Sequence, residues 1–198
     1  NLIDNYELTR NFPIFETSKI GLYIRFGILS IRKLVLLASK SKNYTFLKQL
    51  IWREFFIQIL WHFPNTIHQS FKPKYDSIKW LNDKEKFNLW CQGKTGFPIV
   101  DAGMIQLNSS GFMHNRVRMI VGSFLCKHLL IDWRWGQNYF SQRLIDHDLA
   151  ANNGGWQWSA GSGMDQKPLR IFNPYTQAAK FDPVASYIRC WLPELAHV

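Results

Sequence analysis

Hydrophobic residues recur along most of this chain at spacings of three and four, which is the period of an amphipathic helix. The longest such segment begins at Thr45 and is predicted to form a helix from Phe46 to about His62, before Pro64. Its predicted buried stripe consists of Leu47, Leu50, Ile51, Phe55, Ile59 and Trp61 or His62. The alternation of period two that is typical of strands occurs nowhere in the sequence, so the predicted fold class is all-α.

Side chains that can cap a helix mark the starts of several further helices. Thr17-Ser18, Ser30, Asp83 and Asp132 each precede an apolar, helix-like segment. The first of these predicted helices follows Thr17-Ser18 and ends near residue 27. The others cover 31–39, 84–93, 99–108, 113–131, 133–144 and 183–191. Residues 1–16, 64–82 and 164–182 are expected to be irregular.

The segment from Asp146 to Trp158 departs from this pattern. It concentrates carboxylates, amides, adjacent glycines and two tryptophans, and most of these are poor residues for a helix interior. One interpretation is a polar loop followed by two core tryptophans, and the other is a polar cofactor site with an aromatic wall. Asp146 and Asp148 also form a candidate metal pair, but two carboxylates are a sparse ligand set, so no metal is predicted.

Composition narrows the functional classes. With 46% hydrophobic residues in 198, the chain can bury the core of one substantial domain or two small ones. Its net charge of +10 favours a polyanionic partner, nucleic acid before a membrane surface. The aromatic content of 16% suits base stacking beside phosphate contacts, and it suits a flavin pocket equally well.

Several classes are disfavoured by missing signals. Cys91, Cys126 and Cys190 are odd in number and far apart, which indicates buried free thiols in a reduced, cytoplasmic setting. No uninterrupted apolar run is long enough for a membrane span. The motifs of serine hydrolases, zinc proteases, P-loop proteins and dinucleotide-binding folds are also absent.

Four motifs, in order, resemble the photolyase/cryptochrome family. They are Trp52-Arg53-Glu54-Phe55-Phe56, the segment from Gly93 to Ala102, the segment from Met113 to Met119, and the segment from Asp146 to Trp158. The sequence is most similar to the helical FAD-binding domain of bacterial class I cyclobutane pyrimidine dimer photolyases. The resemblance implies that residues 1–198 form one domain for FAD and DNA lesions. The family's N-terminal α/β antenna domain and the tail beyond Leu195 are missing, so we interpret the chain as a fragment.

The resemblance implies FAD as the cofactor and, in the full-length protein, a second antenna chromophore of unknown identity. Asp146 matches the carboxylate that pairs with Arg118, and Asn152 matches the residue that faces flavin N5. Gly21 stands where the family usually has serine, in the segment that holds the FAD phosphates at a helix N-terminus. The implied cofactor-binding residues are Tyr6, Thr17, Ser18, Lys19, Ile20, Gly21, Arg118, Asp146, His147, Asp148 and Asn152.

The same resemblance implies an electron relay, a lesion pocket and a DNA surface. Trp80, Trp133 and Trp156 match the relay that carries electrons from the surface to the flavin. The pocket for a flipped lesion would comprise Gln49, Trp52, Asn115, Arg116, Met119 and Trp158. Arg10, Arg116 and Gln177 match positions near the DNA backbone.

Two positions bear on the class of lesion. Dimer photolyases generally carry glutamate at the position of Gln49, whereas photolyases of 6-4 lesions often carry glutamine. Asn115-Arg116 and Met119 favour the cyclobutane dimer, because the 6-4 branch usually has a histidine pair where this chain has His114-Asn115.

The resulting prediction is a deoxyribodipyrimidine photo-lyase, a carbon–carbon lyase that acts on UV-damaged DNA. It is expected to be a monomer and not to bind membranes. Photoexcited reduced FAD would transfer an electron to a flipped cyclobutane pyrimidine dimer, which would then split into monomers. Gln49, Asn152 and the three relay tryptophans would carry the catalysis. Two alternatives remain: a cryptochrome-like blue-light photoreceptor without repair activity, and a basic DNA-binding module that no longer holds flavin.

Overall fold

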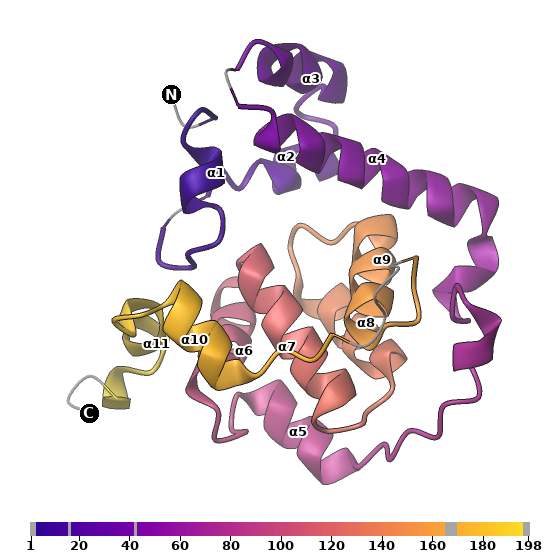
Figure 1. The fold of residues 1–198 in the computed structure, drawn as a ribbon, viewed down its shortest axis with the longest axis vertical. Coiled ribbons are helices and arrows are strands. Elements are labelled where there is room, and N and C mark those ends of the chain that lie inside the picture. The colour runs from indigo at the N-terminus through magenta and orange to yellow at the C-terminus, as the bar shows by residue number, and fades with distance from the viewer. Residues whose placement is uncertain (1–2, 16, 42, 165–169, 196–198) are drawn as a thin grey trace.

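The computed structural model describes residues 3–15, 17–41, 43–164 and 170–195 (Figure 1). Their regular structure is entirely helical, which confirms the predicted all-α class. The α-helices are α1 Tyr6–Thr9, α2 Ile20–Arg25, α3 Ile31–Ser39, α4 Thr45–His62, α5 Lys84–Gln92, α6 Pro98–Ser110, α7 Asn115–Lys127, α8 Trp133–Arg143, α9 Leu149–Ala160, α10 Pro174–Phe181 and α11 Ser186–Trp191. Short 3₁₀ turns cover Pro64–Ile67, Pro73–Tyr75 and Pro193–Leu195.

The helices build two hydrophobic clusters of unequal size. The smaller cluster joins α1 to α4 around buried Leu34, Ala38, Phe46 and Leu50. The larger one joins α5 to α9 and α11, and its largest fully buried side chains include Trp90 and Trp133. In Figure 1, α4 runs from the small cluster across the top of α9, and the two helices pack together. Both helices contribute residues to the wall of the cavity described below.

Three of the four predicted caps are confirmed. The side chain of Ser30 accepts a hydrogen bond from the Lys33 amide, Asp83 caps α5, and Asp132 caps α8. The Thr17-Ser18 cap is wrong. Helix α2 starts after Lys19, which has φ 50° and whose side chain accepts no capping hydrogen bond from the helix.

The predicted buried stripe of α4 is also wrong in most of its length. Only Phe46 and Leu50 of this helix are buried, whereas Ile51 is 59% exposed and Trp61 is 79% exposed. The face of α4 that lines the cavity described below carries Gln49, Trp52, Arg53 and Phe56, so it is offset from the predicted stripe. The last turns of the helix extend beyond its contact with α9 (Figure 1).

Two segments expected to be irregular contain helices. Helix α1 lies within 1–16, and α10 lies within 164–182, where the Asn173 side chain accepts from the amides of Tyr175 and Thr176. Residues 149–158 of the segment from Asp146 to Trp158 lie in α9, so Asn152 and Asn153 occupy a helix, whereas Asp146 and His147 precede it and Asp148 caps it. The helix predicted over 113–131 is shorter, because His114 caps it and it ends at Lys127.

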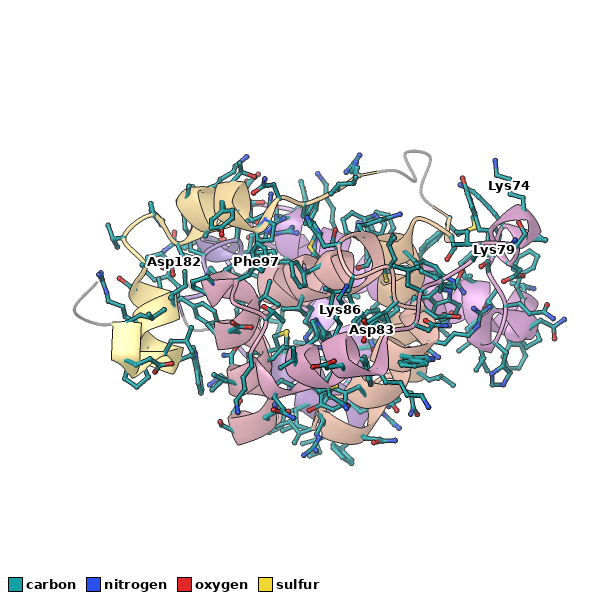
Figure 2. All side chains as sticks on the ribbon, turned by 90° about the horizontal axis from the view of Figure 1, so that it is seen from below. Lys74, Lys79, Asp83, Lys86, Phe97 and Asp182 are labelled. Atoms are coloured by element: carbon teal, nitrogen blue, oxygen red, sulfur yellow. The ribbon has the colours of Figure 1, made fainter. Side chains whose placement is uncertain are left out.

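Figure 2 shows Lys74 and Lys79 near one end of the molecule, far from Asp182 at the other. The prediction of buried thiols holds for Cys126 but not for exposed Cys190. Among the described residues, no helix is both long and apolar enough to cross a membrane.

Candidate functional site

A cavity of about 460 Å³ lies between the α2–α4 side and the α7–α9 side of the protein, and we call it the central cavity. Its wall consists of Gly21, Ile24, Arg25, Gln49, Trp52, Arg53, Phe56, Asn115, Arg118, Met119, Phe140, Leu144, Asp146, His147, Asp148, Ala151, Asn152, Gly155, Trp156, Trp158 and Ser159. The wall thus collects residues from distant parts of the sequence, including twelve of the predicted site residues: Gly21, Gln49, Trp52, Asn115, Arg118, Met119, Asp146, His147, Asp148, Asn152, Trp156 and Trp158.

Helix α9 supplies much of this wall despite its unpromising composition. The side chain of Asp148 caps it by accepting from the Ala151 amide at 3.0 Å. Gly154 is needed for its contact with α4, because a Cβ at this position would lie 2.1 Å from Cδ1 of Phe56. Gly154 therefore serves a close approach of two helices, and tertiary packing outweighs its low helix propensity.

Two arginines neutralise the acidic residues before α9. Arg118 of α7 pairs with Asp146 at 2.9 Å and also donates from Nε to the Met113 carbonyl at 2.7 Å. Arg53 of α4 pairs with Asp148 at 3.4 Å. The Arg118 pair follows the sequence-based expectation, whereas the Arg53 pair was not anticipated. The only sequence signal for it was the place of Arg53 inside the Trp52–Phe56 motif.

Arg25 is a further cavity residue that the sequence did not indicate. Its Nε donates to the backbone carbonyl of His147 at 2.6 Å, which joins α2 to the segment before α9. Burial, and then the positive charge of Arg25, lower the pKa of His147. The imidazole is therefore neutral at pH 7, and its Nε2 is buried without a hydrogen-bond partner in the described structure.

Asn152 and Trp156 form the buried part of the wall. The Asn152 amide donates from Nδ2 to the Gln137 carbonyl at 3.0 Å, which fixes the orientation of its side chain. The Trp156 ring packs edge-on against Phe140, with 4.9 Å between centroids, and against Trp90, with 6.1 Å. Trp156 therefore belongs both to the cavity wall and to the main core.

The other two relay candidates lie in or against the same core, away from the cavity wall. Trp133 is buried, with the Arg134 guanidinium 4.7 Å from its ring centroid, and Trp80 is partly buried. Trp90 was not among the residues predicted for the relay, although its fully buried ring contacts that of Trp156 directly.

The residues predicted near the DNA backbone lie outside the cavity wall. Arg116 donates from Nη2 to the Asn11 side chain at 2.6 Å, and its guanidinium lies 4.2 Å from the Phe181 ring centroid. Burial, followed by the charge of Arg10, lowers the pKa of Arg116. Gln177 lies on the same helix as Phe181, and its Oε1 is buried without a hydrogen-bond partner in the described structure.

Comparison with known proteins identifies the family. Residues 46–198 match the family model described as the FAD binding domain of DNA photolyase. This chain belongs to that family. The FAD-binding domain is 49% identical to the deoxyribodipyrimidine photo-lyase of Vibrio cholerae, over 99% of this chain and 44% of that relative. It spans less than half the length of the curated relatives it matches.

Solved structures agree with this family. A bacterial class III photolyase from Agrobacterium tumefaciens superposes with a TM-score of 0.94 at 43% identity, covering 99% of this chain and 42% of that one. The cryptochrome of Synechocystis superposes with a TM-score of 0.91 at 37% identity, covering 99% and 43%. The helical fold is therefore common to photolyases and a cryptochrome.

The central cavity of this FAD-binding domain fits a flavin nucleotide. Its wall offers aromatic faces, a buried amide and an unpartnered imidazole nitrogen, which suit a planar heterocycle. Among the described residues, no group of three or more histidine, cysteine or acidic side chains is arranged to hold a metal ion.

Five of the predicted cofactor-binding residues do not line the central cavity. Thr17, Ser18, Lys19 and Ile20 precede Gly21, which alone of this segment reaches the cavity. Tyr6 packs in the small cluster with its ring 5.3 Å from that of Phe46, and burial raises the pKa of its phenol.

Proposed function

We propose that this domain binds FAD in the central cavity and, as part of a longer protein, repairs cyclobutane pyrimidine dimers in UV-damaged DNA under light. One observation carries the proposal. A single cavity combines the polar residues expected beside a flavin, such as Asp148 and Asn152, with the residues expected around a lesion, such as Trp52, Met119 and Trp158.

The polar side of the cavity would hold the flavin. Asp146 and Asp148 each pair with an arginine, and their side-chain oxygens can also accept hydrogen bonds from a ring. Asn152 would face N5, because its amide is held in place and carries both donor and acceptor atoms. We further propose that Tyr6, Thr17, Ser18, Lys19 and Ile20 complete the site around the phosphates.

The aromatic side would receive the lesion. Trp52 is 54% exposed although its ring also contacts those of Phe55 and Phe56, so apolar ring surface remains available to a flipped base. Trp158 also lines the cavity and contacts Phe172, with 5.8 Å between ring centroids. Gln49, Asn115 and Met119 would contact the remaining edges of the dimer.

When bound, reduced FAD would supply a light-activated electron to the lesion, and the protein would supply binding, orientation and the electrostatic environment. Trp156 would be the first member of an electron relay, because it alone of the three relay candidates lines the cavity. Trp133 and Trp80 would continue the relay toward the surface.

Outside the cavity, Arg10, Arg116 and Gln177 would contact the DNA backbone. The mutual repulsion of the two arginines favours a phosphate between or beside them, and such contacts would bind without reading sequence. A cytoplasmic location, a monomeric state and a second antenna chromophore remain predictions.

A cryptochrome-like photoreceptor is the second candidate. Two observations favour it: Gln49 stands on the cavity wall where a glutamate would be expected, and the Synechocystis cryptochrome shares the fold.

Repair of a defined lesion tests the proposal. The full-length protein, reduced and loaded with FAD, is mixed with an oligonucleotide that contains one thymine dimer, and is then illuminated or kept dark. Light-dependent return of the intact thymines is expected, with no return in the dark. Bound FAD without light-dependent repair would support the photoreceptor, and a protein that stays colourless with added FAD would support the plain DNA-binding module.

A further inference from the structure

The charges on the central cavity wall do not cancel. Arg118 is paired with Asp146 at 2.9 Å, and Arg53 is paired with Asp148 at 3.4 Å. Arg25 is the remaining cation of the wall, and among the described residues no carboxylate forms a salt bridge with it. Since His147 is neutral, the wall carries one net positive charge.

The position of this charge is defined by α2. Arg25 follows Gly21 by four residues, so the two lie one turn apart on the same face, and both line the cavity. A Cβ added at Gly21 would lie 3.6 Å from Asp146 Oδ2, which places this turn of α2 beside the acidic end of the cavity.

The Arg25 guanidinium is held in place by one hydrogen bond and keeps further donors. Its Nε–H is donated to the His147 carbonyl at 2.6 Å, and the four Nη hydrogens have no partner among the residues that the structure describes, so they are available as donors. An arginine held in this way can present two parallel donors to phosphate oxygens, with less loss of side-chain entropy than a mobile lysine.

We propose that Arg25 binds the diphosphate of the flavin dinucleotide and makes the cavity selective for this anion over uncharged flavin. This inference rests on the proposed function, because it assumes that FAD occupies the cavity. It assigns to Arg25 an anion contact that Gly21, lacking a hydroxyl, cannot provide from its side chain.

The experiment compares FAD with riboflavin, which has the same ring system and no phosphate. Calorimetric titration of the FAD-free full-length protein gives the Kd of each flavin for the wild type, Arg25→Gln and Arg25→Lys. Arg25→Gln is expected to weaken FAD about tenfold and leave riboflavin unchanged, because a charge-assisted bond to phosphate is lost. Arg25→Lys should keep part of the FAD affinity, since it keeps the charge.

A matched control is Arg32→Gln, which removes the same charge from an exposed position of α3 away from the cavity wall. It should leave both Kd values at the wild-type level. Thermal melts monitored by circular dichroism establish that each variant is folded. Because Arg25 is exposed, its substitution is expected to leave the fold intact.

The outcomes separate the claims. Equal weakening of FAD and riboflavin by Arg25→Gln would overturn the inference, because it would assign Arg25 only the structural link to His147. Unchanged FAD affinity would overturn it as well. A wild-type protein that binds neither flavin would overturn the proposed function itself, and this result is distinct from any effect of Arg25.

Discussion

Nη2 of Arg118 lies 3.1 Å from Oδ1 and 2.9 Å from Oδ2 of Asp146, so one nitrogen of α7 spans the carboxylate that precedes α9. Both side chains are largely buried beside the central cavity. Arg118→Gln should therefore lower the free energy of unfolding by about 2 kcal/mol, because it leaves a desolvated carboxylate without its charged donor. Urea unfolding of the full-length protein measures this loss.

A double-mutant cycle checks the assignment of that loss to the pair. Asp146→Asn should cost less than Arg118→Gln, since the amide oxygen still accepts. The double variant should be more stable than the sum of the single losses implies. Strict additivity would show that Arg118 acts through its bond to the Met113 carbonyl instead.

Adjacent glycines of α9 should respond in opposite ways to alanine. At Gly154 the new methyl would lie 2.1 Å from the Phe56 ring, whereas at Gly155 nothing lies within 4 Å. Gly154→Ala is expected to destabilise the protein by about 1–3 kcal/mol through overpacking. Gly155→Ala should instead stabilise it by about 0.5–1 kcal/mol through helix propensity. Equal effects on the urea midpoint would contradict the close approach of α4 and α9.

His114 should make stability fall in mild acid. It is 2% exposed, and its Nδ1 accepts from the Arg116 amide at 3.1 Å to cap α7. Burial, and then the charges of Arg116 and Arg118, lower its pKa from 6.5 to about 4. The unfolded chain therefore binds the proton more readily. Stability is at its full value above about pH 6.5 and is lost as the pH falls toward about 4, by a total on the order of 3 kcal/mol.

His114→Asn provides the control for this titration, because asparagine can cap a helix without titrating. Its unfolding free energy should depend less steeply on pH between 4 and 6.5. Some slope should persist, because burial also lowers the pKa values of His128 and His147. An unchanged slope in the variant would mean that His114 does not titrate as its surroundings indicate.

Gln49 should limit repair. Its side chain lines the central cavity, where a glutamate could donate or share a proton with a negatively charged dimer. Gln49→Glu is expected to raise the yield of repaired thymine dimer per absorbed photon, with little change in damaged-DNA affinity. Equal quantum yields for the two proteins would show that this position has little influence on the reaction.

Trp156 should be required for light-driven reduction of bound FAD in the presence of an external electron donor. Trp156→Phe removes the oxidisable indole from the cavity wall, and the absorbance change on illumination should largely disappear. Trp90→Phe is the matched control, because Trp90 is equally buried and in ring contact with Trp156 but is not part of the wall. A comparable loss in Trp90→Phe would redirect the relay through Trp90.

Local signals in the sequence predicted many of the helices. The caps at Ser30, Asp83 and Asp132 act within a few residues, so their start positions could be predicted before any tertiary contact was known. Asn173-Pro174 is a similar start signal for α10, but it lies within the segment 164–182, which was predicted to be irregular. Helix α9 could not be predicted from propensity, because it contains two adjacent glycines and the close approach of Phe56 that requires Gly154 is a tertiary contact.

The sequence by itself determined the all-α class, most helix starts and, through ordered motifs, the membership of a flavin-binding family. Only the tertiary structure decided which side chains meet. It placed Arg53 on Asp148 and Arg25 on the His147 carbonyl, and it turned one face of α4 toward a cavity. The physical reason is range: caps and periodicity act over a few residues, whereas these contacts join residues about a hundred positions apart, at a crossing of helices that no local pattern encodes.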